Sequence, residues 1–237
     1  MTTPRTIPTK RAIVVRGGWD GHQPVEATAM FIPFLEQNGF RVDIFDGTAI
    51  YADAAVMATV DLIVQCNTMT TIEKAEIAGL RAAVLAGTGL AGWHGGIADS
   101  YRDCADYLQL IGGQFAHHPG KHPSELVGEQ SDNYLPYRID IVPAAADHPI
   151  VRGLEAFSIT TEQYWVLSDD YIDVLATTTL PAREWDAWNR PITSPAVWTR
   201  QWGTGHIFVC TAGHNVAALE NASVHTIIER GLLWASR

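Results

Sequence analysis

The chain has 237 residues, of which 47% are hydrophobic and 18% charged, the balance of an ordinary globular protein. With 16 basic and 26 acidic residues its formal net charge is −10, which argues against binding to nucleic acid or to an anionic membrane surface. No apolar run reaches the roughly 18 residues needed to cross a bilayer. The three cysteines are odd in number and unevenly spaced, so neither a disulfide framework nor a Cys-rich zinc site is expected. We therefore expect a cytoplasmic protein with reduced thiols and no membrane partner.

Strand and helix patterns alternate through the first half of the chain. Residues 1–10 carry prolines and basic side chains but no apolar region, which indicates a flexible lead-in and not a secretory signal. A β-branched run at residues 11–16 predicts a buried first strand, and a helix is expected over residues 25–38, kinked or split at Pro33. The next strands are expected at 41–45, 61–66 and 90–93, with helical segments at 52–58, 70–85 and 98–110. Thr70 and Glu73 fit a capping box that opens the second of these helices.

The second half adds more strands to the same pattern. Residues 112–149 read as a long functional loop with a strand at 137–142. Strands follow at 172–177, 196–200 and 206–211, the last two joined by a hairpin turn at 201–205, and a helix closes the chain over 220–235. The pattern predicts one α/β domain over residues 11–237, with a doubly wound, mainly parallel sheet and helices on both faces. Ligands of such folds lie beyond the carboxyl ends of the strands.

The segment Gly92-Trp93-His94-Gly95-Gly96 has the character of a sharp strand-to-helix turn with His94 at its apex. Small residues on both sides leave an apex side chain exposed above the sheet, beside the backbone N–H groups that begin the helix. Histidine at this position suits a metal ligand or a general acid or base better than a nucleophile that forms a stable acyl intermediate. The alternative is that the glycines only relieve crowding.

The loop after the first strand, Gly17-Gly18-Trp19-Asp20-Gly21-His22, offers stacking, charge and coordination in one place. It contains no G-x-G-x-x-G, and the chain has no G-x-x-x-x-G-K-[ST], so NAD and ATP sites are not expected. Eight tryptophans and nine histidines are an excess that favours a small-molecule site.

Two further segments carry candidate residues. His117, His118 and His122 have the composition of a metal site, although solvated loop histidines are an equally good interpretation. Glu162 and Tyr164, two residues apart in an extended strand, would project to the same face and could pair with a histidine or bind sugar hydroxyls. Glu162 considered alone is more typical of an ordinary salt-bridge partner.

Taken together and in this order, these segments resemble the ThuA-like (trehalose-utilisation) family over nearly the whole chain. The matching residues are His22; His94 with Asp99; Phe115 to Pro119 with His118; Asp147-His148-Pro149-Ile150; Arg152-Gly153-Leu154; Glu162 and Tyr164; Pro195-Ala196-Val197-Trp198; Gly203 and Gly205; and Gly213-His214. Gly95-Gly96 and Thr161 depart from the family pattern.

The resemblance implies a fold like that of class I glutamine amidotransferases, with His94 where a working glutaminase has its cysteine. It implies an enzyme of carbohydrate catabolism acting on a disaccharide or keto-glycoside, by acid–base or metal-assisted chemistry; the alternative is an inactive module that binds a sugar or a partner protein. The implied catalytic residues are His94, Glu162, His22 and Tyr164. The implied substrate-binding residues are Trp19, Asp20, Trp93, Asp99, His118, Trp165 and His214. The implied ligands of a divalent metal such as zinc are His22, His94, His118 and Glu162. A homodimer is expected only because dimers are the commonest homo-oligomers.

Overall fold

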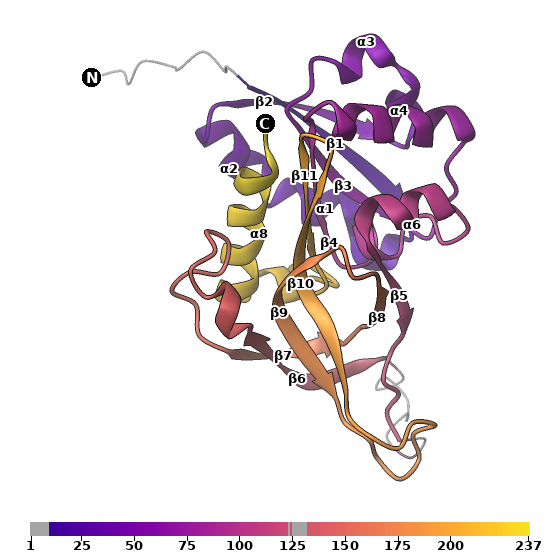
Figure 1. The fold of residues 1–237 in the computed structure, drawn as a ribbon, viewed down its shortest axis with the longest axis vertical. Coiled ribbons are helices and arrows are strands. Elements are labelled where there is room, and N and C mark those ends of the chain that lie inside the picture. The colour runs from indigo at the N-terminus through magenta and orange to yellow at the C-terminus, as the bar shows by residue number, and fades with distance from the viewer. Residues whose placement is uncertain (1–9, 123, 125–131) are drawn as a thin grey trace.

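The computed structural model describes residues 10–122, 124 and 132–237, and in this part of the chain a nine-stranded mixed sheet forms the centre of the molecule (Figure 1). In sheet order the strands are β2 (Phe40–Asp46), β1 (Lys10–Gly18), β3 (Leu62–Thr68), β4 (Gly89–Trp93), β11 (Gly205–Cys210), β10 (Ile192–Trp202), β9 (Asp173–Leu180), β6 (Tyr134–Ile141) and β7 (Phe157–Glu162).

The first five strands of this order, β2-β1-β3-β4-β11, are parallel. Successive residues of β1 face opposite sides, so Ala12 and Val14 enter one hydrophobic cluster while Ile13 and Val15 enter the other. A strand buried on both faces needs apolar side chains at every position, which is why the first strand reads as a continuous apolar run. The order corresponds to the 2-1-3-4-5 order of flavodoxin-like folds, and the predicted α/β class is confirmed.

Helices cover both faces of the parallel half, as predicted. The first face carries α1 (Pro24–Ala29), α2 (Ile32–Gln37) and α8 (Ala222–Ala235), and the short α7 (Val216–Leu219) precedes α8. The other face carries α3 (Ala54–Met57), α4 (Lys74–Leu85), α5 (Gly95–Ala98) and α6 (Ala105–Ile111). Fully buried side chains such as Leu35 on the first face and Leu80 on the second each contribute roughly 1.5–3 kcal/mol to folding.

The other four strands, β10, β9, β6 and β7, extend the sheet in antiparallel fashion. A separate two-stranded sheet of β5 (Gly113–His117) and β8 (Trp165–Ser168) lies beside them. The sheet is therefore parallel only in its first half, and β5 is a strand that the sequence pattern did not indicate. The one extended strand expected around Glu162 and Tyr164 is two strands, β7 and β8. The predicted hairpin turn is confirmed, because Trp202 of β10 pairs with Gly205 of β11.

Helix boundaries show where local patterns competed with tertiary contacts. The helix expected over 25–38 is split into α1 and α2, and Pro33 takes a position in the first turn of α2, where its missing N–H costs nothing. The single helix expected over 98–110 is wrong, because α5 ends at Ala98 and α6 begins at Ala105. The carbonyl groups of Asp99 and Ser100 accept hydrogen bonds from the backbone of residues 69–70 instead of continuing a helix.

The predicted capping box is also wrong, because α4 begins at Lys74 with Glu73 as its N-cap. The Glu73 backbone N–H donates to the Glu76 carboxylate at 2.9 Å. Thr70 instead donates its hydroxyl to the Asn67 side chain at 3.1 Å, so it serves a turn and not the helix.

The remaining boundary predictions have mixed outcomes. The expected lead-in at 1–10 lies outside the described residues except for Lys10, which already belongs to β1. Of the loop expected over 112–149, residues 123 and 125–131 lie outside the described part, and β5 and β6 occupy much of the rest. β6 includes most of the predicted strand at 137–142, and α8 confirms the closing helix with a later start. Within the described residues, no helix combines the length and apolarity that a membrane span requires.

Candidate metal and catalytic site

Three histidines stand at the carboxyl ends of parallel strands. His22 ends a short 3₁₀ helix (Asp20–His22) after β1, His94 follows β4, and His214 lies four residues after the end of β11. All three side chains are buried. This is the edge at which α/β sheets place their ligands, and the structure brings the three rings together there.

His94 occupies a strained turn between β4 and α5. Its backbone has φ 47° and ψ −140°, a conformation that costs a residue with a Cβ free energy and that persists only where surrounding structure enforces it. The following glycine is required by packing, since a Cβ on Gly95 would lie 2.4 Å from Cε1 of His22. The glycines at this turn therefore do more than relieve local crowding: Gly95 allows the His22 and His94 loops to touch.

Glu162 reaches the same point from the antiparallel half of the sheet, at the end of β7. Its Oε2 lies 2.9 Å from Nδ1 of His214, 3.1 Å from Nε2 of His94 and 3.5 Å from Nε2 of His118. Nδ1 of His214 is also 3.3 Å from Nε2 of His94. Four residues, His22, His94, Glu162 and His214, each offer one atom that could bind a metal, and these four atoms all lie within 4.8 Å of one another. We call these four residues the His/Glu cluster.

Backbone carbonyl groups determine which nitrogens of two rings carry hydrogen. Nδ1 of His94 lies 2.7 Å from the Thr211 carbonyl oxygen, which can only accept, so this nitrogen donates. Nδ1 of His118 likewise donates to the Gln163 carbonyl at 3.2 Å. In a neutral ring the other nitrogen then carries a lone pair, and in both rings that nitrogen faces the Glu162 carboxylate. Lone pairs therefore face a carboxylate, an arrangement that calls for a cation or a proton between them.

Burial sets the charge state of the cluster. It lowers the pKa of His22 to about 2 and, together with the neighbouring rings, keeps this imidazole neutral near pH 7. Burial also lowers the pKa of His94 and of His118. For Glu162, burial alone would raise the pKa, but hydrogen bonding to His214, the largest opposing effect, holds it well below its usual range. The His22 and His94 imidazoles of the cluster are thus held neutral beside the Glu162 carboxylate.

The donor set and spacing of the His/Glu cluster fit a divalent transition metal. In a tetrahedral zinc site, four ligand atoms at about 2.0–2.1 Å from the metal lie roughly 3.3 Å from one another. The facing atoms of His94, His214 and Glu162 are separated by a similar 2.9–3.3 Å. Two rings are held from behind, His94 by the Thr211 carbonyl and His22 by the Thr68 hydroxyl at 2.9 Å. Such outer contacts fix the tautomer and orientation of metal-ligating histidines. The cluster can therefore hold a metal ion.

The predicted ligand set needs one correction. His214, expected among substrate-binding residues, belongs to the His/Glu cluster, whereas His118, expected as a ligand, lies outside the four-residue group. The reason is topological: His118 follows β5 and lies 3.5 Å from Glu162, while His214 follows β11, the strand next to β4. His117 and His122 do not join the cluster either; they contact Trp188 and Trp185.

Two aromatic residues predicted for the site do lie against it. Trp19 is 47% exposed, and its ring centroid is 4.8 Å from that of His22 and 6.1 Å from that of His214. Tyr164 is buried with its ring 4.1 Å from the His94 ring at 32°. It shares no strand with Glu162, because β7 ends at Glu162 and β8 begins after Tyr164, so the expected same-face alternation is wrong although both residues contact His94.

The other predicted substrate-binding residues are not members of the His/Glu cluster. Trp93 was expected to stack on a sugar, but it is 1% exposed and packs against Phe31 in the core, so its ring offers no accessible face. Asp99 is buried and pairs with Arg102. Asp20 is exposed next to Trp19. Trp165 lies at the start of β8, against Trp188.

Sequence reasoning missed the residues that hold the cluster from outside. Thr68 ends β3 and Thr211 follows β11. Their positions at the carboxyl ends of predicted strands were the one sequence feature that could have identified them as site residues. Tyr134 had no such signal: its ring lies 5.2 Å from that of His214, and its hydroxyl accepts a hydrogen bond from Asn215 at 2.9 Å.

Comparison with known proteins gives a family and a fold. The sequence matches the ThuA family, described as trehalose utilisation, over residues 11–235. A ThuA-like protein from Bacteroides uniformis ATCC 8492 superposes with a TM-score of 0.74 at 16% identity, covering 99% of this chain and 94% of that one. A ThuA-like protein from Parabacteroides merdae ATCC 43184 gives 0.72 at 16% identity, covering 95% and 89%. A cytoplasmic protein from Salmonella typhimurium LT2 gives 0.62 at 12% identity, covering 96% and 100%. No curated protein matches. The family match spans nearly the whole chain, and the chain therefore belongs to the ThuA (trehalose utilisation) family.

Proposed function

We propose that this chain is a carbohydrate-catabolism enzyme that acts on a disaccharide or keto-glycoside at the His/Glu cluster, with a divalent metal, zinc by preference, held by His22, His94, His214 and Glu162. The observation that carries the proposal is the convergence of three buried imidazoles on one buried carboxylate. Clusters of perturbed titratable groups at a strand edge are typical of catalytic centres. The family's link to trehalose utilisation supports a carbohydrate as the substrate.

The donor set favours zinc because imidazole nitrogens with one carboxylate are common ligands of catalytic zinc. A bound ion would supply Lewis-acid polarisation of a sugar oxygen. Glu162 supplies the negative charge that partly balances a divalent cation in a buried setting.

Within the proposal, His118 transfers the proton. Its Nδ1 is fixed by the Gln163 carbonyl, so its Nε2 carries the lone pair, 3.5 Å from Glu162 and outside the ligand group. Either hydrolysis, in which water loses a proton as it attacks, or enolisation, in which a carbon beside a carbonyl loses one, requires such a base. Burial lowers the pKa of His118, which keeps Nε2 free to accept a proton near pH 7.

Trp19 supplies the adjacent stacking surface. It is half-exposed beside His22 and His214, and aromatic faces pack against the apolar side of sugar rings. A sugar on Trp19 would have its hydroxyl groups next to the cluster. Tyr164 is buried against the His94 ring and serves to position it.

Glutamine hydrolysis is not part of the proposed function. The apex of the elbow is His94, and the thiols of Cys66 and Cys210 are both fully buried, which raises the pKa of each to about 12. A thiol with that pKa provides almost no thiolate at neutral pH.

The unpaired state of all three cysteines also supports a reducing, cytoplasmic location for the enzyme.

Elemental analysis by plasma mass spectrometry, combined with turnover assays, tests the proposal. Untagged wild type should retain near-stoichiometric metal and should convert at least one member of a panel of disaccharides and keto-glycosides. His94→Ala and Glu162→Ala should lose both, while His206→Ala, whose ring stacks on Trp234 away from the cluster, should keep both. Metal-free wild type that still turns over would refute the metal and leave acid–base chemistry, whereas sugar binding without turnover would indicate a binding module.

A further inference from the structure

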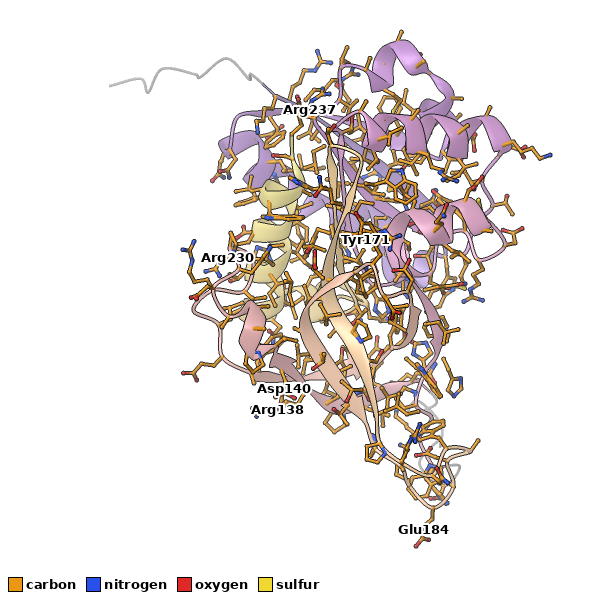
Figure 2. The ribbon with its side chains drawn as sticks, viewed as in Figure 1. Arg138, Asp140, Tyr171, Glu184, Arg230 and Arg237 are labelled. Atoms are coloured by element: carbon orange, nitrogen blue, oxygen red, sulfur yellow. The ribbon has the colours of Figure 1, made fainter. Side chains whose placement is uncertain are left out.

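An open cavity of about 430 Å³ is lined by β7, the last strand of the main sheet, and by the short helix α7. β7 contributes Ser158 to Thr161, and α7 contributes Ala217 and Ala218. Arg138, the β6 residue that pairs with Ser158, marks this end of the sheet in Figure 2. The volume falls within the range of small-molecule pockets. We call it the β7–α7 cavity.

The β7–α7 cavity adjoins the His/Glu cluster, although no member of the cluster lines it. Tyr134 lines the cavity, and its ring centroid lies 5.2 Å from that of His214. Asn215, which follows His214 in the chain, also lines the cavity and donates its side-chain amide to the Tyr134 hydroxyl at 2.9 Å. On the β7 side, Thr161 directly precedes Glu162. The cavity and the cluster are therefore built on neighbouring residues of the same two segments.

Thr161 brings an unpartnered hydroxyl to the cavity. The residue is 1% exposed, and its Oγ1 has no hydrogen-bond partner within residues 10–122, 124 and 132–237. Alternation along β7 places Thr161 on the same face as Ile159, which packs in one hydrophobic cluster with Ala218 of α7. The Thr161 side chain therefore lies on the face of β7 that meets α7 and the cavity. A buried hydroxyl without a partner is uncommon in folded proteins, and beside a cavity a ligand can satisfy it.

The lining of the cavity suits a neutral ligand with several hydroxyl groups. Most of its side chains carry a neutral hydroxyl or amide, which can donate as well as accept hydrogen bonds: Tyr134, Ser158, Thr160, Thr161, Asn215 and Asn221. Glu220 adds an exposed carboxylate, which accepts hydrogen bonds from hydroxyl groups and repels anions. The net charge of −10 acts against an anionic ligand in the same direction.

From these observations we infer that the β7–α7 cavity is a second ligand site, which binds a neutral sugar or polyol and uses the Thr161 hydroxyl to recognise it. A ligand hydroxyl that reaches Thr161 supplies its missing hydrogen-bond partner. Ile159, Ala217 and Ala218 offer an apolar surface to the carbon atoms of the ligand. The inference goes beyond the proposed function, because it requires neither a metal nor turnover at the His/Glu cluster.

Nitrogen-15 NMR spectra recorded during titration with glucose test the site. The side-chain amide signals of Asn215 and Asn221 report on the cavity, and the indole N–H signal of Trp19 reports on the His/Glu cluster. Glucose should shift both asparagine signals of the wild type. Thr161→Val removes the hydroxyl, keeps the shape of the side chain and should raise the Kd measured from these signals about tenfold, the loss expected for one hydrogen bond. Thr226→Val removes a hydroxyl bonded to the backbone of α8 and should bind like the wild type.

Urea unfolding of the ligand-free proteins separates lost recognition from a damaged fold. The Thr161 hydroxyl is buried and unpartnered, so its removal in Thr161→Val should leave the unfolding midpoint unchanged or raise it. A lower midpoint would mean that the hydroxyl bonds within the folded protein, which contradicts the inference.

Glucuronate carries a carboxylate on the same ring and serves as the anionic counterpart of glucose. At low ionic strength it should bind the cavity of the wild type less tightly than glucose does. Glu220→Gln should narrow this difference, because it removes the like charge at the cavity. Equal affinities of the wild type for glucose and glucuronate would contradict a site that selects neutral ligands.

The NMR titration also separates this site from the proposed function. Equal glucose affinities of Thr161→Val and the wild type would overturn the role of Thr161. Shifts of the Trp19 signal alone would overturn the cavity site and leave the proposed function in place. Absence of every shift would overturn the cavity site as well, and the proposed function is then judged separately, by turnover.

Discussion

The parallel half of the sheet supplies three buried imidazoles to the His/Glu cluster, whereas the antiparallel half supplies its one carboxylate. His22, His94 and His214 all follow strands of the parallel half, and Glu162 ends β7 at the opposite edge of the sheet order. Neither half contains a site by itself, because three neutral donors leave a divalent cation's charge unbalanced and one buried carboxylate would be unpaired. The site exists where the two halves meet, so changes on either side should affect it in different ways.

Removing the charge contributed by the antiparallel half should have the largest effect. Glu162→Gln keeps the size of the side chain and one oxygen but loses the negative charge that faces the rings. We expect kcat on the substrate found by screening to fall about 10²–10⁴-fold, the usual contribution of a group acting directly in catalysis. Glu155→Gln, an exposed carboxylate elsewhere, is the control. Activity of Glu162→Gln equal to that of this control would show that the antiparallel half only supports the fold.

The second prediction asks whether the two halves fold together. Trp93 lies in the core of the parallel half, and Trp198, on β10, lies in the antiparallel half with its N–H bonded to the Ile111 carbonyl at 2.9 Å. Trp→Ala at either position should lower the free energy of unfolding by about 3–5 kcal/mol, through one cooperative transition in urea. Trp→Phe at each position gives a milder variant should the alanine variants not fold. Two separate transitions would show that the halves are independent units.

The parallel half was the part that the sequence could predict. Its strands are buried on both faces, so they read as apolar runs such as residues 11–16, and the glycine-rich turns after them pointed to His22 and His94. The antiparallel half has strands with mixed exposure, such as β7, and their pairing partners are distant in sequence. Local patterns did predict β6, β9 and β10, but they carry no information about such pairing. This is why β5 was missed, and why the one strand expected around Glu162 and Tyr164 was not divided into β7 and β8.

The same distinction explains the errors at the site. Resemblance to the family identified His94, Glu162 and His214 individually, but it put His118 in the place of His214 among the expected ligands. That grouping depends on β11 lying next to β4. The paired residues Gly92 and Val209 are 117 positions apart in the sequence, and no local motif encodes their pairing. Trp93 was expected to bind substrate, yet the alternation of side chains along β4 turns it into the core.

A third prediction concerns the support behind the histidines of the parallel half. Thr68→Val removes the hydroxyl that holds Nδ1 of His22 and keeps the shape of the side chain. Loss of such an outer contact typically weakens metal affinity by 10–100-fold, and we expect a loss of about that size in zinc competition with a chromophoric chelator. Thr226→Val removes a hydroxyl bonded only to the backbone of α8 and should leave affinity unchanged. Equal affinities in the two variants would contradict a ligand role for His22.

The smallest expected effect is on the pH dependence of stability in metal-free protein. The pKa of His22 is about 2 in the folded chain and about 6.5 when unfolded, so both states are neutral above pH 6.5 and His22 then contributes nothing to the pH dependence. Below pH 6.5 only the unfolded state takes up this proton, which lowers the free energy of unfolding by up to about 1.4 kcal/mol for each pH unit. His22→Gln removes that term, so urea unfolding between pH 6.5 and 5 should show a shallower loss of stability than in wild type. Parallel curves for the two proteins would mean that His22 is protonated in the folded state, and the neutral ligand set contributed by the parallel half would then be wrong.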